Sequence, residues 1–253
     1  MKGVDFGKAA GDYARHRAGF PPSLFERLAA LGVGLPGQRV LDLGTGTGTL
    51  ARGFAERGAE VTGLDVAQPI LDEAARLADE RGLRVRWLRG RAEDTGLDGG
   101  AFDIVSAGQC WHWFDRVRAA AEVRRLLAPG GAFVVAYLDW ISLPGSIADA
   151  TETMMERANA EWKWRGWSSG NLRWLDDAAL AGFACREAFA YDVEVPYSHE
   201  SWRGRVRASA GIGASLPPDA VQRFDDSLRQ MLAERFPADP FVVTHRVFAM
   251  IAR

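Results

Sequence analysis

The chain has 253 residues, of which 47% are hydrophobic and 25% are charged, and its formal net charge is -2. This composition is typical of a globular protein and excludes a disordered, collagen-like or coiled-coil chain. The balanced charge also argues against nucleic acid or an anionic membrane surface as a partner, because both recruit strongly basic proteins.

Strand and helix patterns alternate along the first 140 residues. Apolar residues at helical spacing predict helices over residues 23–32, 49–58, 70–82 and 118–131. Short apolar runs predict strands over residues 38–44, 59–66, 83–90, 101–109 and 132–140. Because parallel strands need crossover connections, the alternation predicts a parallel sheet with helices on both faces.

The pattern changes after residue 140. We expect helices over residues 147–163, 176–182 and 219–234, with a tryptophan-rich loop over 165–175. Two late strands, 186–197 and 241–253, flank an insertion and should extend one edge of the sheet as a hairpin.

The two cysteines, Cys110 and Cys185, are too few for a disulfide framework and are not clustered as zinc ligands are. We expect both to be reduced, and we expect no metal site. The first residues lack the apolar core of a signal peptide, and no apolar run reaches the ~18 residues that a membrane span needs. We therefore expect a cytoplasmic protein.

Residues 40–48 read VLDLGTGTG and join the first strand to a helix. Glycines at 44, 46 and 48 let the backbone approach a ligand, and the amides of the helix N-terminus then point at it. Asp65 ends the second strand, where a carboxylate can accept both hydroxyls of a ribose. In the alternative interpretation the loop is only a tight turn, and Asp65 is a helix N-cap.

The glycine spacing decides between two kinds of nucleotide cofactor. Dinucleotide-binding loops have the spacing GxGxxG, whereas this loop has GxGxG. Asp42 stands at the loop entrance, where its charge would repel a pyrophosphate and suit a cationic ammonium group. The pattern favours a nucleoside with an amino-acid tail over NAD.

Five segments occur in order along the chain: DLGTGTG, GLDV, GRAED, FDIVSAGQCWHWFD and LLAPGG. Over about residues 13–140 they resemble the motifs of class I S-adenosylmethionine-dependent methyltransferases. The segment YARHR at 13–17, Phe20-Pro21 and GQCWHWFD are similar to the small-molecule branch that includes trans-aconitate methyltransferase-like proteins. Thr45 stands where the family usually has cysteine, a departure that leaves backbone contacts intact.

The resemblance implies an α/β fold with a Rossmann-like, mostly parallel seven-stranded sheet whose last strand is antiparallel. We treat the chain as a single methyltransferase domain. Cap helices would occupy residues 1–32, the cofactor-binding core 36–140, and Trp-rich lid insertions on the acceptor side 141–180 and 198–238.

The resemblance also implies the residues that contact S-adenosylmethionine or its product S-adenosylhomocysteine. Asp42 would act at the methionine ammonium, Gln109 would lie near the sulfonium, and Asp65 would hold the ribose hydroxyls. Val66 would lie against the adenine and Ala92–Glu93 at its edge. The full set is Tyr13, Arg17, Asp42, Gly44, Thr45, Gly46, Gly48, Asp65, Val66, Ala92, Glu93 and Gln109.

Several of these residues also have an ordinary structural interpretation. Tyr13 and Arg17, which would close over the cofactor, would otherwise lie on a helix surface. Glu93 would otherwise belong to a solvated turn, and Gln109 would cap its strand.

Eight of the nine tryptophans fall between Trp111 and Trp202. Trp111 and Trp140 follow the fourth and fifth strands, so we expect them to line an acceptor pocket; core packing is the alternative. His112 is the candidate general base, and a hydrogen-bonded structural histidine is the alternative. A carboxylate acceptor would need no base.

Residues 202–207, WRGRVR, concentrate arginine before the last helix. A guanidinium matches a carboxylate in a bidentate fork. At helical spacing Arg203 and Arg207 share a face, so we expect them to bind an anionic acceptor and Arg205 to be exposed. A solvated face is the alternative.

These features predict a methyltransferase that moves a methyl group by direct displacement onto an O, N or C nucleophile of a small molecule, with a carboxylate among the candidates. A non-catalytic S-adenosylmethionine-binding protein stays open as an alternative. An NAD-dependent oxidoreductase is disfavoured by the glycine spacing. The sequence does not distinguish a monomer from a homodimer.

Overall fold

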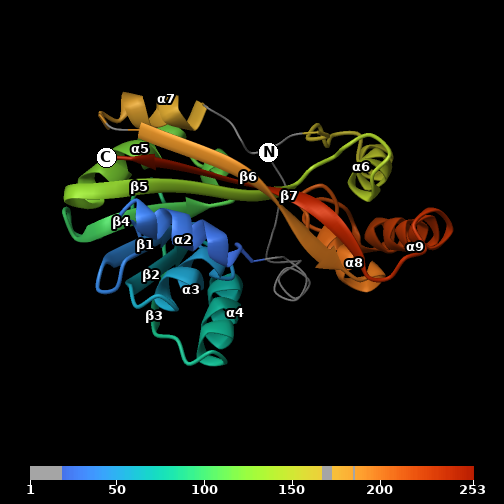
Figure 1. Ribbon diagram of the computed structural model, residues 1–253, viewed down its shortest axis with the longest axis horizontal. Coiled ribbons are helices and arrows are strands. Elements are labelled where there is room, and N and C mark those ends of the chain that lie inside the picture. Colours follow the sequence, from blue (N-terminus) through green and yellow to red (C-terminus); the bar gives the residue numbers. More distant parts are fainter. Residues whose placement is uncertain (1–18, 167–172, 185) are drawn as a thin grey trace. The chain divides into compact units, whose positions relative to one another are not determined.

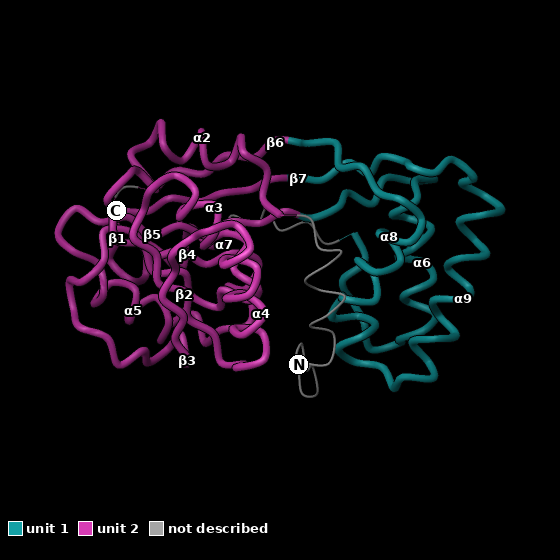
Figure 2. Tube along the Cα trace, turned by 90° about the horizontal axis from the view of Figure 1, so that it is seen from below, with its two compact units in different colours: residues 1–18, 139–168, 192–246 teal, residues 19–138, 169–191, 247–253 magenta. Residues whose placement is uncertain are grey.

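The computed structural model describes residues 19–166, 173–184 and 186–253 (Figure 1). These residues form two compact units, coloured separately in Figure 2. Unit 1 contains residues 139–166 and 192–246. Unit 2 contains 19–138, the described part of 173–191, and 247–253.

A seven-stranded sheet has the order β3-β2-β1-β4-β5-β7-β6. Strand β1 pairs in parallel with β2 and β4, β2 with β3, and β4 with β5. The Rossmann-like fold with an antiparallel last strand is thereby confirmed. The strands are β1 (Arg39–Leu43), β2 (Glu60–Asp65), β3 (Val85–Arg89), β4 (Phe102–Gly108), β5 (Leu127–Trp140), β6 (Arg186–Tyr197) and β7 (Phe241–Ala252).

Side-chain contacts show that β6 and β7 run in opposite directions. Arg246 binds Asp192 in a bidentate pair, and Thr244 donates to Glu194 at 2.8 Å. The partner number falls as the β6 number rises, as in an antiparallel ladder. The late hairpin at the sheet edge is thus confirmed.

The helices of unit 2 cover a sheet whose central strands are buried. Four of the five residues of β1 are buried, as expected for a parallel strand with both faces covered. Helices α5 and α7 pack together, and they lie side by side at the upper left of Figure 1. The helices are α2 (Pro22–Ala30), α3 (Thr49–Ala55), α4 (Gln68–Asp79), the 3-10 turn η2 (Trp111–Trp113), α5 (Arg116–Leu126) and α7 (Arg173–Leu180).

Unit 1 has a hydrophobic core of its own, formed by its three helices and the adjoining strand ends. Trp202 is its largest fully buried side chain and donates from Nε1 to Thr151 Oγ1 at 3.0 Å. Ser146 caps α6, and Ser198 forms a capping box at the start of α8, so both helix starts are fixed locally. The helices are α6 (Ile147–Ala158), α8 (His199–Arg207) and α9 (Pro218–Arg235).

Most helix ends differ from the sequence expectation by one to three residues, as α3 and α4 do, which end at Ala55 and Asp79 before the expected glycine stops. Three further differences have an identifiable cause or consequence. The helix expected to reach residue 131 ends at Leu126, because the chain turns at once into β5 and Pro129 cannot continue a helix. Helix α6 ends at Ala158 rather than at 163, since Asn159 is already extended. Helix α7 begins at Arg173 rather than at 176 and belongs to unit 2, not to the insertion.

No helix among the described residues is long and apolar enough to cross a lipid bilayer.

We predict that Gly53→Ala lowers the free energy of unfolding by about 1–3 kcal/mol, the usual cost of overpacking. A Cβ at Gly53 would lie 2.0 Å from the ring of Phe25, which itself packs edge-on against Phe54 between α2 and α3. Urea denaturation measures the change. Gly19→Ala is the control, because among the described residues no atom lies within 4 Å of a Cβ built there. Equal effects of the two substitutions would contradict the packing argument.

Candidate functional site at the glycine loop

The glycine loop follows β1 in a backbone conformation that side chains disfavour. Gly44 and Gly46 have φ 58° and Gly48 has φ 77°. A Cβ at Gly44 would lie 2.9 Å from both Cys110 Sγ and the Phe114 ring. The loop therefore packs directly against the segment that follows β4, and glycine is required there by the fold itself.

Asp65 connects the end of β2 to the glycine loop. Its Oδ2 accepts from the Gly46 amide at 3.0 Å, and its Oδ1 accepts from the Ala67 amide at 3.0 Å. The side chain is half-buried at the carboxyl end of the strand. Because an ionised carboxylate can accept about four hydrogen bonds, its outer lone pairs can still accept the hydroxyls of a ligand.

Asp42 lies beneath the loop and is 1% exposed. Its two oxygens accept from Thr45 Oγ1 at 2.7 Å and from Ser106 Oγ at 2.8 Å. Burial raises the pKa of the Asp42 carboxyl to about 6, while the two hydroxyl donors oppose that rise. The fully buried carboxylate contacts the loop through the hydroxyl of Thr45, which is itself buried, and this fits an indirect action on a cation.

Gln109 directly follows β4 and has a strained backbone conformation. Its φ is 63°, and among the described residues it is the non-glycine residue with a positive φ. The backbone amide donates to Ala136 O at 2.8 Å, and Nε2 donates to Leu138 O at 2.6 Å. Both bonds are made to β5, so Gln109 fixes the ends of the two strands; strain of this kind is concentrated at functional sites.

The turn η2 carries His112. Before it, Cys110 donates from Sγ to Leu43 O at 3.1 Å, which connects η2 to the start of the glycine loop. His112 Nδ1 lies 2.8 Å from the hydroxyl oxygen of Tyr137, and its ring lies 4.6 Å from that of Trp113. Tyr137 is fully buried and stacks on Trp174 of α7. Several elements of unit 2 thus hold the histidine in place.

Three residues expected near the adenine follow the ends of β2 and β3. Ala92 is buried, and Glu93 accepts from the Asp115 amide at 3.1 Å while lying 3.4 Å from Arg91. Val66, after β2, is 57% exposed, as a residue that packs against a flat ring needs to be. The Glu93 carboxylate therefore already has a partner within the protein, the backbone amide of Asp115.

Trp111 does not line a pocket, which corrects the sequence expectation. Its indole is fully buried against Phe133 and Phe114, and Nε1 donates to Asp177 Oδ2 at 2.9 Å. The core of unit 2 needs a large ring beneath η2, and Asp177 on α7 supplies the hydrogen-bond acceptor that makes its burial favourable.

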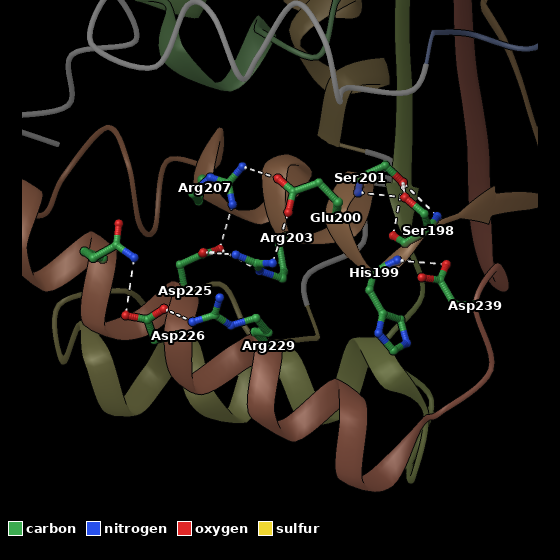
Figure 3. Close-up of polar contacts among 11 residues, drawn as sticks. Ser198, His199, Glu200, Ser201, Arg203, Arg207, Asp225, Asp226, Arg229 and Asp239 are labelled. Carbon is green, nitrogen blue, oxygen red and sulfur yellow. Dashed lines mark hydrogen bonds and ion pairs between the residues drawn. The ribbon is translucent and has the colours of Figure 1, made fainter.

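The arginines of α8 do not lie as expected for the binding of an anionic acceptor (Figure 3). Arg203 and Arg207 do share a face, but both bind Asp225 of α9 and Glu200. Their guanidiniums therefore join α8 to α9 instead of facing an acceptor. Arg205, expected to be exposed, is 7% exposed, and its guanidinium lies 4.8 Å from the centre of the Trp140 ring.

Trp140 stays a candidate for the acceptor side. Its indole is half-buried in unit 1, donates to Glu152 Oε1 at 2.8 Å and packs edge-on against Trp202. The Arg205 guanidinium lies over the Trp140 ring in a cation–π contact, so part of the indole face is already occupied.

Tyr13, Arg17 and Cys185 lie outside the described residues. Within the part of the chain that the structure describes, no group of His, Cys, Asp and Glu could hold a metal ion.

Sequence reasoning missed the residues that support the site. Ser106 and Tyr137 sit inside buried strands, where a polar side chain needs a partner, and each contacts a candidate residue. Polar residues within apolar strands could therefore have been recognised in the sequence as needing a buried partner. Cys110 and Phe114 approach Gly44 only in the folded chain, and no local sequence pattern predicts this contact.

Comparison with known proteins supports the resemblance to methyltransferases that the sequence motifs indicate. A family model described as "Methyltransferase domain" matches residues 40–131. A malonyl-[acyl-carrier protein] O-methyltransferase of Enterobacter lignolyticus is 33% identical, covering 83% of this chain and 78% of that protein. An uncharacterized methyltransferase of Mycobacterium tuberculosis is 37% identical over 57% of this chain, and the match spans 58% of that protein's length.

Two solved structures share the fold. A putative type II methyltransferase from Anaeromyxobacter dehalogenans has a TM-score of 0.61 at 24% identity, covering 94% of this chain and 97% of that one. Phosphoethanolamine N-methyltransferase 2 of Haemonchus contortus, in complex with S-adenosyl-L-methionine, has a TM-score of 0.55 at 18% identity, covering 98% of this chain and 56% of that one.

Asp65→Ala is expected to weaken S-adenosylhomocysteine binding at least about tenfold, since a hydrogen bond to a charged group contributes about 1.5–3 kcal/mol. Titration calorimetry measures the dissociation constant. Asp72→Ala removes an exposed carboxylate from α4 and is the matched control. Unchanged affinity in Asp65→Ala would mean that the ribose is held elsewhere.

Binding of S-adenosylhomocysteine is also expected to weaken as the pH falls through about 6, because Asp42 then loses the charge that attracts the ammonium group. Thr45→Val removes a donor that stabilises the charged carboxylate, so the midpoint moves to higher pH. Calorimetry across the pH range measures both midpoints.

Thr153→Val serves as the control for this titration, because its hydroxyl donates to the Asp149 carbonyl within α6 and not to Asp42. A midpoint that does not move in Thr45→Val would assign the pH dependence to another group.

Proposed function

Because the chain belongs to the class I S-adenosylmethionine-dependent methyltransferases, we propose that it transfers the methyl group of that cofactor to a small-molecule acceptor. The observation that carries the proposal is the pair of carboxylates at the glycine loop. Asp65 is held by the Gly46 amide, and Asp42 reaches the loop through Thr45.

The described residues fit this cofactor. The outer lone pairs of Asp65 suit ribose hydroxyls, exposed Val66 suits an adenine face, and buried Asp42 suits a cationic amino-acid tail. A pyrophosphate would carry negative charge toward both carboxylates, which disfavours NAD. Glu93 is better suited to shaping the adenine edge through the backbone, since its carboxylate is occupied.

When bound, S-adenosylmethionine supplies a methyl group on a positively charged sulfur, which an acceptor displaces in line. The protein's own part is orientation: Gln109 fixes the ends of β4 and β5 through its two bonds to β5. The Cys110 and Phe114 contacts with Gly44 fix η2 against the loop. Accurate placement of this kind contributes much of the acceleration of a displacement.

Trp140 stays a proposed acceptor-binding residue, because it ends β5 and its indole is half-buried. Several relatives, the Enterobacter protein among them, carry names that specify O-methylation of malonyl-[acyl-carrier protein], which suits an oxygen nucleophile. Operation in the cytoplasm, as a monomer or homodimer, stays a prediction.

Titration calorimetry is expected to show binding of S-adenosylmethionine and S-adenosylhomocysteine and negligible binding of NAD. Turnover of S-adenosylmethionine with a panel of carboxylic acids and phenols then identifies the acceptor class. Comparable affinity for NAD would contradict the cofactor assignment. Cofactor binding without turnover of any acceptor would instead favour the non-catalytic alternative.

A further inference from the structure

Arg52 is a buried cation on α3 that lies next to the glycine loop. It is 7% exposed, and burial lowers the pKa of its guanidinium to about 10, so the group stays charged at neutral pH. Among the described residues no carboxylate forms an ion pair with it, and its Nε has no hydrogen-bond partner. A buried charge without a counter-ion is costly, so packing alone does not explain an arginine at this position.

Arg52 holds two consecutive carbonyl groups of the glycine loop. Its backbone amide donates to Gly48 O at 2.8 Å, at the point where α3 begins. Its Nη1 donates to Thr47 O. Gly46 and Gly48, on either side of Thr47, both have a positive φ, so the chain there follows neither a helix nor a strand. One residue of the helix therefore fixes the orientation of both loop carbonyls.

The side-chain bond to Thr47 replaces a bond that a regular helix would make. In an α-helix a carbonyl accepts from the amide four residues later, which for Thr47 is the Ala51 amide. That amide is directed at the Asp42 carboxyl instead: burial raises the pKa of Asp42, and the Ala51 amide is one of the donors that oppose this rise. Thr47 is 2% exposed, so water does not readily serve its carbonyl, and the Arg52 guanidinium takes the place of the amide.

We propose that Arg52 is a positioning residue for the cofactor site: by holding the Thr47 carbonyl, it leaves the Ala51 amide available to the Asp42 carboxylate beneath the glycine loop. This rests on the proposed function above, in which Asp42 suits the cationic tail of the cofactor. Arg52 acts through the loop and through Asp42 and needs no contact with a ligand. Without the guanidinium, the Ala51 amide would return to the Thr47 carbonyl, and Asp42 would lose a donor.

The charged groups near Arg52 are paired with other residues. Glu56 follows α3, Glu73 lies on α4, and Arg81 follows α4. Arg81 donates to Glu56 at 2.8 Å, and Arg76 binds Glu73 at 2.7 Å. Burial lowers the pKa of Arg52 most, Arg81 adds to this effect, and the two glutamates oppose it. The loop carbonyl is therefore the group on which this guanidinium acts.

The groups around Asp42 define what the Ala51 amide contributes. Thr45 of the loop and Ser106 of β4 donate from their hydroxyls, and the charge of Asp65 at the end of β2 raises the pKa of Asp42 further. The Ala51 amide is the donor that comes from α3. Its loss should make the charged carboxylate less stable, so that Asp42 takes up a proton at a higher pH.

NMR of the ligand-free protein tests this arrangement without the cofactor. In the wild type the Ala51 amide proton is expected to titrate with a midpoint of about 6, because its acceptor is the Asp42 carboxyl. In Arg52→Met the size of this titration shift should fall by at least half. Arg57→Met is the matched control and should leave it unchanged, since Arg57 also donates from Nη1 to a backbone carbonyl of α3, that of Gly53 at 2.9 Å.

Titration calorimetry with S-adenosylhomocysteine is the second test. Arg52→Met is expected to raise the dissociation constant about fivefold at pH 8, the effect of one lost hydrogen bond, and to move the midpoint of the pH dependence upward. Arg52→Lys keeps a charged donor and should restore most of the affinity. Because Arg52→Met removes a buried unpaired charge, its urea midpoint without ligand should stay within about 0.5 M of the wild type, whereas a packing role would lower it.

An Ala51 amide that does not titrate in the wild type overturns the proposal, as does an Arg52→Met protein with wild-type affinity and midpoint. A lowered urea midpoint in Arg52→Met with an undiminished Ala51 titration also overturns it and assigns Arg52 to packing alone. Calorimetry on the wild type separates the two levels. Cofactor binding together with a silent Ala51 amide refutes only the role of Arg52, whereas absent cofactor binding refutes the proposed function itself.

Discussion

The close approach of Gly44 to Cys110 and Phe114 is the constraint on which the site depends. No side chain fits between them, and a φ of 58° excludes most residues for a second reason. This contact sets the glycine loop against η2 at the end of the sheet where the paired strands β1 and β4 both finish. Asp42, Asp65, Gln109 and His112 are then gathered at one end of the sheet although they are distant in sequence.

Polar groups around this contact are satisfied largely by one another. Asp42 is bonded to two hydroxyls, Asp65 to two amides, Gln109 to two carbonyls and His112 to a phenol. A network of this kind holds its geometry before any ligand arrives, because moving one member would leave another buried group without its bond. Binding then costs little reorganisation.

Local patterns predicted the alternating core because periodicity and glycine stops are local properties. They also placed Asp65 at a strand end, where the structure has it. The errors concern partners remote in sequence. Arg205 was misjudged because it packs over the Trp140 ring, a contact that spacing within α8 does not indicate. The burial of Trp111 depends on Asp177 of α7, and no spacing rule connects those two positions.

Strand β7 belongs to both units: its residues up to Arg246 count with unit 1 and those from Val247 with unit 2. Since β7 neighbours β5 but follows it only after α6, α7, β6, α8 and α9, a ribosome must synthesise all these elements before β5 can pair with β7. Contacts of such long sequence separation slow folding. During synthesis the backbone groups on one edge of β5 stay unpaired until β7 has been made. Because an unpaired edge can pair with another chain, the nascent protein is the form most in need of protection from aggregation.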